Sequence, residues 1–162
     1  MVRRAVLFVC VCLGVLAAAC ASSGRGGGSA LYRREIGNAS FLDAMSLGTR
    51  IVQQFQYEVF QVDTTAGEIS ILTHWKARRP YSDELALGVT TGESRLHIVG
   101  RERGQNDLCK FYNVNLTLEN RLRVAGSADW NESTNTPMFT QRADELVAEF
   151  RRQLSNIGVR RC

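Results

Sequence analysis

Two segments of the chain repeat apolar residues at the spacing of an amphipathic helix. In the first, Ser40 is a suitable N-cap residue. In the second, Thr136 or Asn135 caps the helix and Pro137 occupies its first turn. The apolar stripes consist of Phe41, Met45, Gly48, Ile51, Val52 and Phe55 in the first helix and of Phe139, Ala143, Leu146, Val147, Phe150 and Leu154 in the second.

Between these helices apolar and polar residues alternate, which is typical of strands with one buried face. Residues 63–67 predict a turn because Gly67 can take a positive φ, and the polar segment 76–92 predicts a long loop. The expected strands span residues 57–62, 68–76, 94–101, 108–118 and 121–128. In the second of them, the residues expected to share one face are Ile69, Ile71, Thr73 and Trp75.

The order of these elements predicts an α+β fold. Its short connections leave no room for crossover helices, so we expect an antiparallel sheet of four to five strands. Both helices, one N-terminal and one C-terminal, should pack on one face of this sheet. A chain of 162 residues is long enough for one such domain, which we place at residues 38–162.

The first 19 residues have the composition of an export signal. Arg3 and Arg4 form a positive start, and an apolar stretch follows from residue 5 to residue 19. This stretch is shorter than the roughly 20 apolar residues that span a bilayer. Residues 1–19 are therefore expected to be a cleaved signal peptide.

The sequence Leu16-Ala17-Ala18-Ala19-Cys20 resembles the lipobox of bacterial lipoproteins, although that family usually has Leu at the position of Ala17. The resemblance implies that Cys20 carries diacylglycerol and becomes the mature N-terminus, with acyl chains such as palmitate as the anchor. Ala21 is not the Asp that retains many such lipoproteins at the inner membrane. By the same resemblance, the protein is expected at the outer membrane, lipid-anchored and facing the periplasm.

The alternative is an ordinary signal peptide that leaves a soluble periplasmic protein. The segment after Cys20 favours the tether, because residues 20–37 begin with a Gly- and Ser-rich stretch of little apolar mass. We expect residues 20–37 to form a flexible linker between the lipid and the domain.

The charge of the chain argues against nucleic acid as a partner. The formal net charge is +4, and removal of Arg3 and Arg4 with the signal lowers it to +2. Nucleic-acid binding normally requires a clustered basic surface. Arg95, His97, Arg101, Arg121 and Arg123 share outward strand positions and are candidates for contacts with anionic lipid headgroups or an acidic partner. The alternative is that this alternation serves only solubility.

The remaining reactive residues predict no enzyme. Cys109 and Cys162 are the cysteines that follow Cys20, and they form either a disulfide or two free thiols. His74 and His97 lack the additional nearby ligands of a zinc site. Gly126-Ser127-Ala128 lacks the second glycine of a nucleophile elbow. We therefore expect no catalytic residue, no metal and no cofactor.

The segment YEVFQVDTTAGEISILTHWK after the first helix, the basic and apolar strands, Trp130 and the closing helix resemble helix-grip domains of envelope lipoproteins. The family concerned is that of the C-component lipoprotein of the outer-membrane β-barrel assembly machine. The lipopolysaccharide-assembly lipoproteins share a plan of two helices and one sheet. These resemblances imply an envelope protein as partner and a role in envelope assembly.

Three functional hypotheses follow. The first is a non-enzymatic, membrane-anchored interaction module in outer-membrane assembly or maintenance. The second is a carrier of lipid or glycolipid, which predicts a cavity lined by residues such as Phe55, Trp75, Leu116 and Phe150. The third is a small hydrolase, which predicts converging polar side chains with shifted pKa values. The sequence leaves the oligomeric state open.

Overall fold

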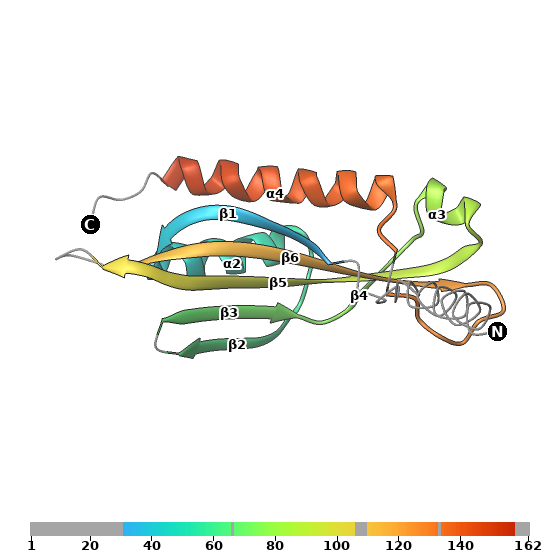
Figure 1. Cartoon of the computed structure of the whole chain (residues 1–162), viewed down its shortest axis with the longest axis horizontal. Helices are drawn as coiled ribbons and strands as arrows, with labels where there is room; N and C mark the ends of the chain where they lie inside the picture. Colours follow the sequence, from blue (N-terminus) through green and yellow to red (C-terminus); the bar gives the residue numbers. More distant parts are fainter. Residues whose placement is uncertain (1–30, 66, 106–109, 133, 158–162) are drawn as a thin grey trace, which may run out of the picture.

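The computed structural model describes residues 31–65, 67–105, 110–132 and 134–157. In these ranges the α+β prediction is confirmed, with an antiparallel sheet in the strand order β1-β6-β5-β3-β2 and with β4 paired to β5 (Figure 1). The predicted signal peptide, Cys20, Cys109 and Cys162 lie outside the described residues. The elements are β1 (Tyr32–Ser40), α2 (Phe41–Gln54), β2 (Val59–Thr65), β3 (Glu68–Thr73), β4 (Lys76–Arg78), α3 (Ser82–Ala86), β5 (Val89–Gln105), β6 (Lys110–Val124) and α4 (Pro137–Ile157).

The two long strands β5 and β6 form the centre of the sheet. They pair from Val89 opposite Val124 to Gln105 opposite Lys110. The separate strand expected at residues 121–128 is therefore wrong, because residues 121–124 continue β6 without a break. Ser94 and Asn120 are buried polar residues that lie opposite each other in this ladder. Because these polar residues occupy buried positions, they interrupt the alternation of apolar and polar residues, and the sequence pattern does not show how long the strands are.

The first strand corrects the predicted linker. Residues 32–37 fall within the flexible linker that the sequence predicts at 20–37, but they belong to β1, which pairs with β6. A bulge between Glu35 and Gly37 shifts the register and interrupts the two-residue period. Gly37 has a φ of 148°, and a Cβ there would lie 3.2 Å from Leu154 Cδ2 of α4. With β1 and β4 included, the sheet has six strands rather than four or five.

The strand expected at residues 68–76 is also interrupted. Four residue steps from Leu72 to Lys76 match three steps from His97 to Ser94 on β5, so the chain carries one extra residue between β3 and β4. At this bulge Thr73 Oγ1 accepts a hydrogen bond from the Leu96 backbone N–H at 2.9 Å. The extra residue reverses the alternation that follows it.

Both predicted helices are present and cover the same side of the sheet. The Ser40 side chain caps α2 by accepting a hydrogen bond from the Asp43 backbone N–H at 3.2 Å. Gly48 permits close packing, because a Cβ there would lie 2.8 Å from Ile71 Cδ1. Helix α4 runs alongside β1, while α2 lies behind the sheet in Figure 1. The strands and these two helices bury one continuous core.

The loop expected at residues 76–92 contains the short strand β4 and helix α3. This helix begins with an ordered turn, in which the Glu84 carboxylate accepts a hydrogen bond from the Tyr81 backbone N–H at 2.8 Å. None of the helices that the structure describes combines the length and apolar character needed to span a bilayer.

Candidate functional site

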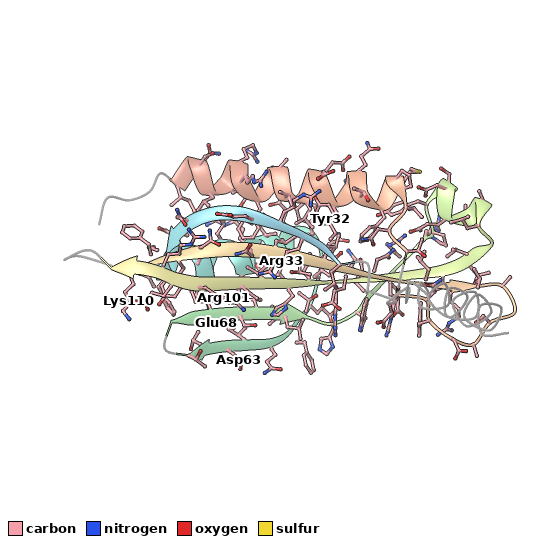
Figure 2. The ribbon with its side chains drawn as sticks, in the orientation of Figure 1. Tyr32, Arg33, Asp63, Glu68, Arg101 and Lys110 are labelled. Carbon is pink, nitrogen blue, oxygen red and sulfur yellow. The ribbon has the colours of Figure 1, made fainter. Side chains whose placement is uncertain are left out.

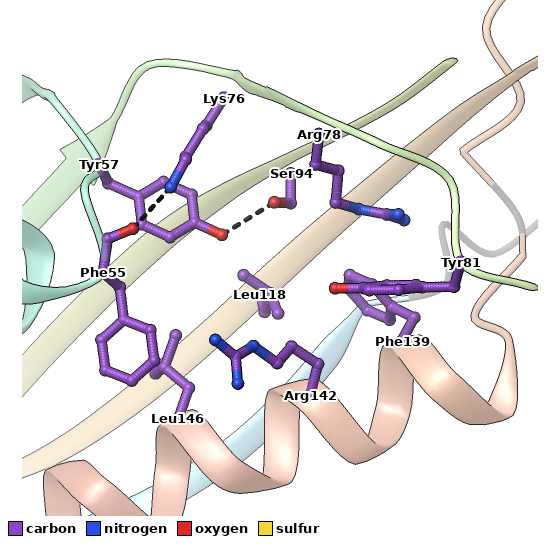
Figure 3. Close-up of a pocket in the computed structure, with 10 residues that line it drawn as sticks. All are labelled: Phe55, Tyr57, Lys76, Arg78, Tyr81, Ser94, Leu118, Phe139, Arg142 and Leu146. Carbon is purple, nitrogen blue, oxygen red and sulfur yellow. Dashed lines mark hydrogen bonds between the residues drawn. The ribbon is translucent and has the colours of Figure 1, made fainter. Parts of the chain in front are cut away.

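A pocket of about 130 Å³ lies between α4 and the inner face of the sheet (Figure 3). Four stretches of the chain form it: the end of α2, strand β4 with the residues after it, the centre of β5 and β6, and the first half of α4. Its lining residues are Phe55, Tyr57, Lys76, Arg78, Tyr81, Ser94, Leu118, Phe139, Arg142 and Leu146.

Tyrosine and serine hydroxyls form part of the polar wall of the pocket. Tyr57 Oη lies 2.8 Å from Ser94 Oγ, and either group can donate in this hydrogen bond. The Tyr81 hydroxyl is directed toward the pocket in Figure 3. Burial raises the pKa values of Tyr57 and Tyr81 above the ordinary value of 10. Both hydroxyls therefore keep their protons at neutral pH and can act as donors.

Lys76 and Arg142 bring positive charge to the pocket from opposite sides. Lys76 Nζ donates a hydrogen bond to the Phe55 carbonyl oxygen at 2.8 Å and lies 5.1 Å from the centre of the Tyr57 ring. Arg142, on α4, forms an ion pair with Glu145 one turn further along the helix. Among the described residues, Lys76 has no carboxylate within ion-pair distance.

A buried ion pair closes the end of the pocket. Arg78 donates to both carboxylate oxygens of Glu84, at 2.7 and 2.6 Å, and to Asn120 Oδ1 at 2.9 Å. The Glu84 side chain is fully buried and the Arg78 side chain is 12% exposed. The guanidinium carbon lies 4.3 Å from the centre of the Tyr81 ring. This geometry fixes the Tyr81 side chain and neutralises the charge of Arg78.

Gly92 supplies the space that this arginine needs. The residue lies opposite Arg78 in the β4–β5 ladder, and a Cβ there would lie 3.0 Å from the Arg78 guanidinium carbon. A larger residue would require the guanidinium to shift by a few tenths of an ångström. Gly92 therefore leaves room for Arg78 in its present position.

A second, more open hollow of about 520 Å³ adjoins the pocket and shares Phe55, Lys76 and Arg142 with it. Its outer rim includes Glu149, whose pKa is lowered to about 2, chiefly by hydrogen bonds from Arg152 and then from Gln153. Glu149 is thus engaged by its neighbours on α4. The hollow gives the pocket a route to solvent.

The five residues predicted to form a basic surface lie on the opposite, open face of the sheet. The β5–β6 register directs Arg95, His97, Arg101, Arg121 and Arg123 to this face. Three of them are paired with carboxylates. Arg101 forms an ion pair with Glu68 at 3.1 Å, and both residues are labelled in Figure 2. The other pairs are Arg95 with Glu119 and Arg121 with Glu93. The contact of this surface with anions stays a prediction, and these carboxylates offset much of its charge.

Two tryptophans lie among these arginines. The Trp75 ring has the guanidinium carbons of Arg95 and Arg121 at 4.6 and 4.1 Å from its centre. The Trp130 ring has Arg121 and Arg123 at 4.6 and 4.1 Å. Such stacking is favourable because a cation is attracted to the face of an aromatic ring. The expectation that Trp75 shares a face with Ile71 is therefore wrong, since the bulge after β3 reverses it.

His97 lies half-buried on the open face, where its Nε2 is 2.9 Å from Ser70 Oγ. Burial lowers the pKa of His97 below the ordinary value of 6.5. The imidazole is therefore mainly neutral at neutral pH and adds little to a basic surface.

The cavity expected of a lipid carrier is not formed by the predicted residues. Leu116 and Phe150 are buried in the packed core, and Trp75 lies on the opposite face. Of the four, only Phe55 lines the pocket. Within the ranges described above, no group of three or more His, Cys, Asp or Glu side chains is arranged to hold a metal ion.

Apart from Phe55, the sequence does not point to the residues that line the pocket. Lys76, Tyr81 and Arg142 come from a predicted loop and from the polar face of a predicted helix, so no periodic pattern marked them. The one available signal was Arg78-Arg79-Pro80-Tyr81 followed by Asp83-Glu84, which places opposite charges close together. Their pairing required the turn before α3.

No known family model matches the chain, and a search of curated proteins finds no match either.

Replacement of Glu84 should destabilise the protein strongly. Glu84→Ala leaves the Arg78 charge buried and unpaired, so we expect the free energy of unfolding to fall by about 3–5 kcal/mol. The matched control, Glu145→Ala, breaks an exposed pair and should cost less than about 1 kcal/mol. Urea unfolding followed by tryptophan fluorescence measures both. Equal losses in the two variants would contradict a structural role for the buried pair.

His97 should make stability depend on pH in the acidic range. Because its folded-state pKa is lowered, the unfolded chain takes up a proton first as the pH falls through 6.5. Stability should therefore be full above pH 6.5 and decline as the pH falls through the lower folded-state pKa. NMR titration of the histidine ring protons measures this pKa, with His74→Gln to assign the resonances. His97→Gln should remove this part of the pH dependence.

Proposed function

We propose that this protein is a membrane-anchored envelope lipoprotein that acts as a non-enzymatic interaction module in outer-membrane assembly or maintenance. In this proposal Cys20 carries the lipid, and the domain described above binds an envelope protein. The observation that carries the proposal is the exposed edge strand β2.

Strand β2 is the last strand in the order of the sheet, and all seven of its residues are exposed. Among the described strands it pairs with β3 alone, so none of them occupies its other edge, which presents backbone N–H and C=O groups. Three of its side chains are apolar: Val59, Phe60 and Val62, of which Phe60 is 58% exposed. Proteins usually protect such an edge with charges, proline or a covering element.

An extended segment of another protein fits this edge. Addition of a strand satisfies the open backbone groups, and apolar side chains at the edge provide specificity. Phe60 stacks edge-on against His74 at 4.9 Å between centres, which gives the aromatic ring a fixed position at the surface. A strand from an envelope partner is therefore the occupant that we propose.

The structure gives less support to a carrier of long lipids. An engineered cavity of about 150 Å³ holds a molecule as small as benzene. The pocket beneath α4 is of comparable size, at about 130 Å³, and has a partly polar wall. A long acyl chain does not fit in it.

The anchor is tested by Cys20→Ser. We expect the wild-type chain to fractionate with membranes and its N-terminal peptide to carry fatty acid in mass spectrometry, because two or more acyl chains give stable attachment. Cys20→Ser should abolish the modification, whereas Cys109→Ser should retain it. Processing that globomycin does not alter, with no fatty acid on the first residue, would contradict the anchor.

The edge strand is tested by cross-linking in living cells. A photoreactive amino acid at position 60 should yield one covalent adduct with an envelope protein. The same probe at Leu42, which is 75% exposed on α2, should yield none. Val62→Lys should remove the adduct from position 60 without unfolding the protein, because the side chain is exposed. An adduct between two copies of this chain, or equal labelling at both positions, would contradict the proposal.

A further inference from the structure

We propose that the pocket beneath α4 binds a small organic monoanion, the carboxylate of a compact acid, and that Lys76 pairs with its charge. The inference rests on the pocket alone. It depends neither on the lipid anchor nor on the edge strand β2.

The sign and size of the ligand charge follow from the cations that line the pocket. Arg78 is neutralised by Glu84, and Arg142 forms an ion pair with Glu145. Lys76 remains the lining cation without a carboxylate partner among the described residues. One uncompensated positive charge in a partly enclosed pocket favours a ligand with one negative charge.

The donors that surround the pocket match a carboxylate. The Lys76 ammonium has three N–H groups, of which one binds the Phe55 carbonyl oxygen. The Tyr57 and Ser94 hydroxyls share one hydrogen bond, so one of their two protons is available to a ligand. Tyr81 contributes a further hydroxyl, which makes no hydrogen bond within the described part of the chain. Hydrogen bonds to a charged acceptor are the stronger class.

The other part of the pocket is apolar and limits the size of the ligand. Leu118, from β6, and Leu146, from α4, contribute aliphatic side chains to its lining (Figure 3). Phe55 and Phe139 complete this wall. A volume of about 130 Å³ accommodates about six non-hydrogen atoms, by comparison with the benzene-sized cavity described above. A short branched carboxylic acid meets both requirements.

The neighbouring hollow provides access for such a ligand. It shares Lys76 and Arg142 with the pocket, so an anion that enters from solvent meets both cations first. The acidic residues at its rim are engaged by neighbours, Glu145 by Arg142 and Glu149 by Arg152. They therefore repel an entering anion less than free carboxylates would.

The experiment uses the full chain, purified in a non-ionic detergent and titrated with sodium isobutyrate. Amide chemical shifts in NMR spectra report the binding site, and their concentration dependence reports the affinity. We expect saturable shifts centred on Ser94 and Leu118. Isobutyramide, a neutral molecule of the same shape, and inorganic phosphate are titrated in parallel. Isobutyrate should bind at least about tenfold more tightly than either, since the amide lacks the charge and phosphate lacks the apolar part.

Matched variants separate the role of Lys76 from a general effect of charge. Lys76→Met should weaken isobutyrate binding by about tenfold or more, as expected when a charged hydrogen bond is lost. Lys110→Met removes an exposed lysine paired with Glu102 and should leave the affinity unchanged. Tyr81→Phe should weaken binding by a smaller factor, and it retains the aromatic contact with Arg78. Unchanged amide spectra outside the pocket show that the variants are folded.

Several results would overturn the proposal. They are equal affinity for isobutyrate and isobutyramide, an affinity that Lys76→Met leaves unaltered, and shifts that do not saturate or lie outside the pocket. Tighter binding of phosphate than of isobutyrate would also reject a carboxylate in favour of a different anion. None of these results bears on the anchor at Cys20 or on cross-linking from β2, so the two proposals fail separately.

Discussion

One extra residue between β3 and β4 decides which side chains reach the pocket. Without it, the two-residue period of β3 would direct Trp75 toward the helices and Lys76 toward the open face. The bulge exchanges them, so that Lys76 reaches the Phe55 carbonyl oxygen and Trp75 stacks with Arg95 and Arg121. Thr73 compensates for the interruption of the ladder, because its hydroxyl oxygen accepts a hydrogen bond from the Leu96 backbone N–H. The pocket and the tryptophan–arginine stack thus share one cause.

The two faces of the sheet differ in how their charged side chains are paired and exposed to solvent. On the open face, three of the predicted arginines have a carboxylate partner on a neighbouring strand, and solvent screens what remains. Beneath α4 the same residue types are enclosed, so each unpaired charge costs more and also attracts a counter-ion more strongly. A surface with many paired arginines is therefore a weaker candidate for anion binding than a pocket whose lysine has no carboxylate partner in the described part of the chain. The count of basic residues in the sequence pointed to the open face, where contact with anions stays a prediction.

Much of the fold could be predicted because burial leaves a periodic signature. The stripes that begin at Phe41 and Phe139 gave both long helices, and the alternation around Leu116 gave the central strand. The signature failed where the backbone departs from regular geometry. The bulge at Gly37 interrupts the alternation in β1, so the sequence pattern does not indicate that strand. The bulge after Thr73 places Trp75 on the opposite face from the one predicted. The pocket is lined by Lys76 and Arg142, which lie far apart in the chain, so no local period records it.

The exposure of β2 follows from the number of helices available to cover the sheet. A helix with its side chains is roughly 10 Å across, and neighbouring strands lie about 4.8 Å apart, so one helix covers about two strands. Helices α2 and α4 can therefore cover about four strands of the path β1-β6-β5-β3-β2. Because α4 lies over β1, the strand left without a covering helix is the one at the other end of the sheet, β2. This edge strand exposes Phe60 and two valines. A further strand added to it would bury these apolar side chains and form hydrogen bonds with its open backbone groups.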